Sequence, residues 1–155
     1  MTKSIYSLIA AAVMAGAVSA NAAAQVSVSR PWIRATVPVQ KSSGAFMVLT
    51  SKQDARLIEV TSPVASGVEM HQSQQQGDLM KMAQVDAIDL PAGKSVNLAS
   101  GGYHLMLIGL KQQLKEGSTV PLTLVVQSSK GKRTQVTVAV PIKALAYAPA
   151  TSPAP

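Results

Sequence analysis

The chain has 155 residues, a formal net charge of +7 and no cysteine. This length allows one domain, and the lack of thiols excludes disulfide stapling, so the fold must rest on its hydrophobic core. A basic chain can bind nucleic acid, but here the Lys and Arg residues are dispersed and aromatic residues make up only 3%, so nucleic-acid binding is not expected.

The first 24 residues have the three regions of a secretory signal peptide. Lys3 precedes an apolar stretch over residues 5–18, and small residues follow at 19–24. Cleavage after Ala22 and cleavage after Ala24 satisfy the small-residue rule equally well. The apolar stretch is shorter than the roughly 20 residues of a membrane-spanning helix, and without cysteine no lipoprotein-type anchor is expected. The sequence predicts an exported, periplasmic protein whose mature chain has no membrane span.

From residue 26 onward, short runs rich in β-branched residues alternate with turn residues, and no helical periodicity persists. The predicted strands cover residues 26–36, 44–50, 56–61, 67–72, 79–87, 95–98, 103–110, 121–127 and 134–142. Eight or nine short strands at this spacing predict an all-β barrel or sandwich, a single domain over residues 25–143. Residues 144–155 are rich in Ala and Pro and are predicted to be a disordered tail.

Each of the two histidines lies near a methionine. His104 and Met106 are two residues apart in a predicted strand, so they project from one face while Leu105 projects from the other. A ring nitrogen and a thioether sulfur are therefore predicted to point the same way.

The other histidine lies in a segment predicted to form a hairpin. A turn centred on Gln76 and Gly77 within residues 68–85 places His71 directly opposite Met82. Opposed residues of an antiparallel pair share a face, with Cβ atoms about 4.5–5.5 Å apart. This hairpin predicts a second pair of one imidazole and one thioether.

Together, His71, Met82, His104 and Met106 form a set of two nitrogens and two sulfurs with no charged ligand. Soft thioethers favour Cu(I), whereas zinc usually recruits thiolate or carboxylate, and calcium and magnesium require oxygen. The sequence predicts one Cu(I) per chain. A blue-copper site would need a cysteine, and a hydrolase would need a nucleophile with a base and an orienting group, so we expect neither an electron carrier nor an enzyme.

Three further methionines are candidates for core packing or for extra metal ligation. Met47 is expected to fill the core. Met70 alternates in facing with His71 and is expected to point inward. Met80 shares a face with Met82 and is expected to pack, or to stand at the rim of the site as an alternative sulfur.

The spacing of the four predicted ligands resembles that of the periplasmic copper chaperone family PCu(A)C. The family pattern is His, ten residues, Met, twenty-one residues, His, one residue, Met, and the chain matches all three gaps. The resemblance extends over residues 26–142 and includes the segments RPWIRAT at 30–36, SGAFM at 43–47, VEMH at 68–71 and GGYHLM at 101–106.

This resemblance implies a cupredoxin-like Greek-key fold that carries Cu(I) in the periplasm. It also implies delivery to a copper-acceptor protein, either the cytochrome c oxidase subunit with the dinuclear copper centre or a thiol-based copper chaperone. A monomer is expected. Some family members carry a His- and Met-rich C-terminal extension, but residues 143–155 contain neither residue. The alternative interpretation is an exported β-sandwich that binds a protein or glycan and holds no metal.

Overall fold

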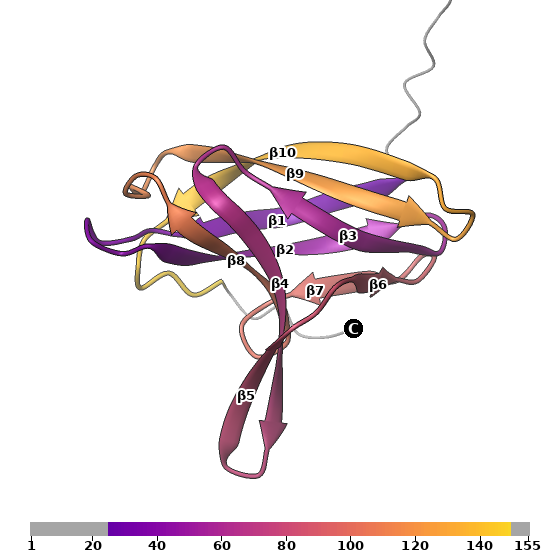
Figure 1. Ribbon diagram of the computed structural model, residues 1–155, viewed down its shortest axis with the longest axis horizontal. Coiled ribbons are helices and arrows are strands. Elements are labelled where there is room, and N and C mark those ends of the chain that lie inside the picture. The colour runs from indigo at the N-terminus through magenta and orange to yellow at the C-terminus, as the bar shows by residue number, and fades with distance from the viewer. Residues whose placement is uncertain (1–24, 150–155) are drawn as a thin grey trace, which may run out of the picture.

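The computed structural model describes residues 25–149, which form strands joined by turns (Figure 1). The strands are β1 (Val26–Arg34), β2 (Ser42–Ser51), β3 (Ala55–Thr61), β4 (Ala65–Gln76), β5 (Leu79–Gln84), β6 (Ile88–Leu90), β7 (Ser95–Leu98), β8 (Tyr103–Leu110), β9 (Thr119–Ser128) and β10 (Arg133–Lys143). The prediction of an all-β fold is confirmed. Residues 25–149 include no helix long and apolar enough to cross a membrane. The predicted signal peptide and residues 150–155 of the predicted tail lie outside the described residues.

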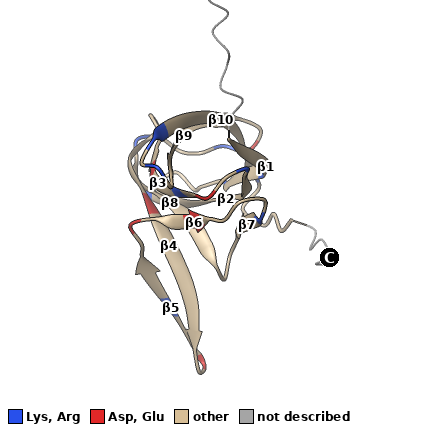
Figure 2. Cartoon of the chain, turned by 90° about the vertical axis from the view of Figure 1, so that its right-hand side faces the viewer, with Lys and Arg blue, Asp and Glu red and all other residues tan. Residues whose placement is uncertain are grey.

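The strands form one sheet that curls into a barrel (Figure 2). Its order is β5-β4-β8-β2-β1-β10-β9-β3-β6, and β7 pairs with β2 beyond the end of the β2–β8 pairing. Neighbouring strands are antiparallel except β1 and β10, which run parallel. Contacts between β3 and β4 bring the two ends of the sheet together. Closing the sheet in this way covers apolar side chains that a flat sheet would expose.

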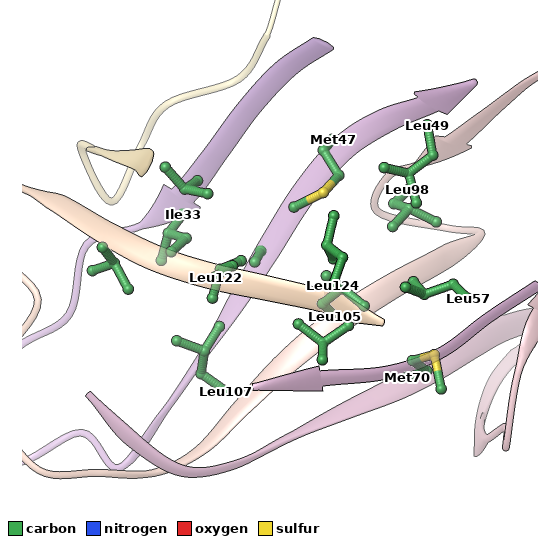
Figure 3. Close-up of a cluster of buried hydrophobic side chains, with 14 of the residues drawn as sticks. Ile33, Met47, Leu49, Leu57, Met70, Leu98, Leu105, Leu107, Leu122 and Leu124 are labelled. Atoms are coloured by element: carbon green, nitrogen blue, oxygen red, sulfur yellow. The ribbon is translucent and has the colours of Figure 1, made fainter. Parts of the chain in front are cut away.

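The interior is filled by alternate residues of the strands (Figure 3). On β8, Leu105 and Leu107 are fully buried, and Leu122 and Leu124 of β9 reach the same cluster. Met70 joins this cluster and is 7% exposed, so the prediction that it points inward is confirmed. Because side chains alternate along a strand, the residues of β4 and β8 that lie between these core positions point to the outer face.

Ten strands are present where eight or nine were predicted, because β6 was not predicted; the strand predicted over residues 79–87 ends at Gln84, and β6 begins at Ile88. β5 pairs with β4, whereas β6 pairs with β3 on the other side of the barrel. The chain therefore has to leave one pairing partner for another, and a bend at Asp86 separates the two strands.

The hairpin of β4 and β5 extends away from the barrel as an arm (Figures 1 and 2). All six residues of β5 are exposed, and its large apolar side chains are among the most exposed large hydrophobic residues of the described part of the chain. Leu79 is 74% exposed, Met80 58% and Met82 59%. The arm therefore presents thioether sulfurs to solvent rather than packing them into a core.

Candidate metal site

The two histidines face each other across the pairing of β4 with β8. His71 is the register partner of His104, and their ring centroids are 5.6 Å apart with the rings inclined at 75°. Both rings are largely covered, since His104 is 5% exposed and the His71 side chain is 17% exposed. Two imidazole rings are thus held at adjacent positions on one face of a sheet.

Met106 lies on the same outer face, one step further along the pairing. It is the register partner of Glu69, and both are partly buried. The neighbouring Leu105 and Leu107 point into the core. The predicted common facing of His104 and Met106 therefore agrees with the strand geometry.

The predicted register of the hairpin is wrong by two residues. His71 pairs with Gln84, and Met82 pairs with Ser73. Gly77 has φ of +61°, as expected for the first central residue of a type II′ turn, so the turn centres on Gly77 and Asp78. The sequence analysis centred it one residue earlier.

The corrected register still leaves Met82 on the face that carries His71. A shift of two residues preserves the facing of every side chain, whereas a shift of one would invert it. Met82 becomes a diagonal neighbour of His71, and such neighbours lie roughly 7–8 Å apart, within reach of long side chains. The structure thus places all four predicted ligands on one face, with Met82 on the exposed arm.

Hydrogen bonds fix which nitrogen of each ring is protonated. His71 Nε2 lies 2.8 Å from Glu69 Oε2, and His104 Nδ1 lies 3.3 Å from the carbonyl oxygen of Gly102. Carboxylate and carbonyl oxygens accept, so each of these nitrogens donates, and the opposite nitrogen of a neutral ring carries the lone pair. His71 Nδ1 is buried and has no hydrogen-bond partner. A buried polar atom without a partner is costly, and a metal ion would satisfy it.

Glu69 was missed by the sequence analysis. It lies two residues before His71 in the same strand, so strand alternation was the available signal. A carboxylate that accepts a hydrogen bond from a ligating histidine fixes the orientation of the ring. Glu69 can do this for His71. No group of three or more His, Cys, Asp or Glu side chains suited to a metal ion occurs within residues 25–149.

The sequence family described as "Putative lipoprotein LpqE-like" matches residues 26–142, nearly the whole barrel. The chain belongs to the LpqE-like family. One relative is "Putative lipoprotein Lxx21020" of Leifsonia xyli subsp. xyli (strain CTCB07), 31% identical over 119 residues, which are 76% of this chain and 69% of that protein.

Solved structures share the fold of this LpqE-like chain. The copper-bound PCuAC domain from PmoF2 superposes with a TM-score of 0.63 at 26% identity, covering 77% of this chain and 93% of that domain. The Cu(I) form of DR1885 from Deinococcus radiodurans gives a TM-score of 0.56 at 31% identity, covering 79% of this chain and 83% of that one. The resemblance to PCu(A)C proteins is confirmed, and with it the cupredoxin-like fold.

The contact between Glu69 and His71 makes a testable prediction. In Glu69→Ala, the His71 ring loses its carboxylate partner, whereas His104 keeps its bond to Gly102. Ring-to-ring nuclear Overhauser effects between the two histidines should weaken in the apo-protein, while unfolding free energy falls by less than about 1 kcal/mol because the pair is partly exposed. Unchanged ring-to-ring nuclear Overhauser effects would show that Glu69 does not orient this ring.

Proposed function

We propose that this LpqE-like protein is a periplasmic metallochaperone that binds one Cu(I) per chain as a monomer and catalyses no reaction. The single observation that carries the proposal is the pair of imidazoles across β4 and β8, one with a buried nitrogen that has no partner. The copper-loaded forms of the PmoF2 domain and DR1885 support a copper cargo. Relatives named as lipoproteins support export.

The four proposed ligands suit the transfer of Cu(I) to another protein. His71 and His104 would supply nitrogen from the barrel, and Met106 and Met82 would supply sulfur. Neutral thioethers bind Cu(I) in preference to the divalent metals that favour oxygen, yet they are weaker ligands than a thiolate. Because Met82 stands on an exposed arm, it is the ligand that an approaching acceptor can displace first. Stepwise exchange would avoid releasing free copper.

Met82→Leu and Met106→Leu should each weaken Cu(I) binding by about tenfold or more, since each removes one soft ligand. Leucine keeps the apolar volume, so the fold should survive. The matched control is Met70→Leu, because Met70 adjoins His71 but points into the core. Anaerobic competition with a coloured Cu(I) chelator measures all three. If both site variants bound as tightly as the control, thioether ligation would be wrong.

The destination of the copper is the second part of the proposal. We propose delivery toward the dinuclear copper centre of cytochrome c oxidase, directly or through a thiol-based copper chaperone. Thiolates at either acceptor bind Cu(I) more strongly than thioethers, so transfer is downhill.

To test delivery, the Cu(I)-loaded protein is mixed anaerobically with the copper-free, reduced dinuclear-copper domain of the oxidase. After separation, copper should be found on that domain, and it should arrive faster than from an equimolar Cu(I)–chelator complex of matched affinity. Transfer no faster than from the chelator would argue for buffering of copper rather than delivery, and would leave the binding site itself intact.

A further inference from the structure

A groove of about 370 Å³ lies on the outer face of the barrel. β1 and β2 form its floor, and the end of β7, the turn after it and residues 147–149 form its walls. The copper site does not use these residues. The sequence analysis assigned residues 144–155 to a disordered tail, but Tyr147 lies in the groove wall.

The floor of the groove is aromatic. Trp32 and Phe46 are register partners on β1 and β2, and their rings stack with centroids 4.5 Å apart. Tyr147 meets Trp32 edge-on at 4.9 Å. Trp32 is only 7% exposed and Phe46 8%, so they form a fixed apolar floor rather than a mobile surface. Such rings supply contact area at little entropic cost.

Two arginines give the groove its charge. The Arg34 guanidinium carbon lies 5.7 Å from the Trp32 ring centroid and 5.9 Å from that of Phe46. Arg30 is exposed and lies in a β-bulge, with φ of +49°. A non-glycine residue in this conformation is strained, and such strain persists where the surrounding structure imposes it. The bulge turns Arg30 to the same groove that Trp32 lines.

No negative charge balances these arginines. The lining residues include no Asp or Glu, and neither arginine has a salt bridge to a carboxylate within the described part of the chain. The sequence as a whole carries +7. A guanidinium fork matches a carboxylate and is well suited to charged interfaces. The groove is therefore complementary to an acidic ligand that also has an apolar side chain to place on the rings.

The groove adjoins the predicted metal site through β2 and the turn after β7. Gly44 is the register partner of Met106, and a Cβ on Gly44 would lie 2.8 Å from Cζ of Phe46, so the ring rests over this glycine. The wall is shared as well. Ala99 lines the groove, and its carbonyl oxygen accepts a hydrogen bond from Gly102 N at 3.1 Å. The carbonyl oxygen of Gly102, in the same turn, accepts a hydrogen bond from His104.

We propose that this groove docks an acidic, aromatic- or leucine-containing segment of the protein that exchanges copper with this chain. The proposal rests on the proposed copper-carrier function for its purpose, but docking itself needs no copper. Carboxylates of the partner pair with Arg30 and Arg34, and an apolar side chain packs on Trp32. Docking there holds the partner beside Met106 and His104 and leaves the arm with Met82 free to move.

Trp32 is the only tryptophan of the chain, so its fluorescence reports directly on the groove. The probe is a capped hexapeptide, Glu-Glu-Leu-Phe-Glu-Glu, titrated into the full copper-free protein, with Gln-Gln-Leu-Phe-Gln-Gln as the neutral control. The acidic peptide should change Trp32 emission saturably and bind at least about tenfold more tightly than the neutral one, with an affinity that falls as salt rises. Equal binding of the two peptides, or no change of emission, would overturn the proposal.

A charge-matched pair of variants separates the groove from the general basic charge. Arg30→Asn with Arg34→Gln removes the two groove cations, and asparagine tolerates positive φ. Lys130→Asn with Lys132→Gln removes two cations from the exposed turn between β9 and β10. The groove variant should lose peptide binding about tenfold while keeping its Cu(I) affinity, and the turn variant should keep both.

If both double variants lost peptide binding equally, the peptide would be attracted by the overall positive charge of the protein and not by the groove. That result would overturn the proposal. If vesicles of anionic phospholipid changed Trp32 emission and the peptide did not, the groove would bind a membrane surface instead. That result would also overturn the proposal. Because the peptide assay is run without copper, its failure is independent of any failure of Cu(I) binding.

Discussion

Antiparallel pairing between β4 and β8 holds the two imidazole rings side by side, and leucines on the opposite face of β8 fix that pairing. Leu105 and Leu107 are fully buried, and burying each is worth about 1.5–3 kcal/mol. A slip of one residue would expose both leucines and force His104 inward. The penalty, roughly 3 kcal/mol or more, keeps the histidines on the outer face. The core of the barrel thus specifies the geometry of the metal site.

The all-β fold, the facing of His104 and Met106 and the inward position of Met70 were predictable, because strand alternation acts over two residues. The hairpin register was not. Whether the turn centres before or after Gly77 depends on its backbone conformation, which composition alone does not decide. The predicted facing of Met82 was nevertheless correct, because a register error of two residues leaves every side chain on the same face.

Other features depend on contacts between distant segments. β6 was missed because its pairing partner, β3, lies some thirty residues earlier in the chain. The groove was missed for a similar reason, since a bulge in β1 brings Arg30 and Trp32 to one side and Tyr147 arrives from the far end of the chain. Glu69 could have been found from the local sequence, because it lies two residues before His71 in the same strand, but it was overlooked.

The site combines a rigid base with an exposed arm. His104 and Met106 lie on β8, which pairs with β4 on one side and β2 on the other, whereas β5 pairs only with β4 and buries none of its residues. Elements with few buried contacts open at low free-energy cost. A carrier must both hold and release its metal. In the proposed site, the ligands on the barrel would hold the copper, and Met82 on the arm would let go of it first. The aromatic and basic groove adjoins the rigid side, where a docked partner would not hinder the arm.

X-ray absorption at the copper edge, recorded on the anaerobically loaded Cu(I) protein, tests the central claim most directly. We expect a first shell with both nitrogen and sulfur scatterers, two of each, and multiple-scattering features of imidazole. A first shell without sulfur, or without imidazole, would contradict the claim.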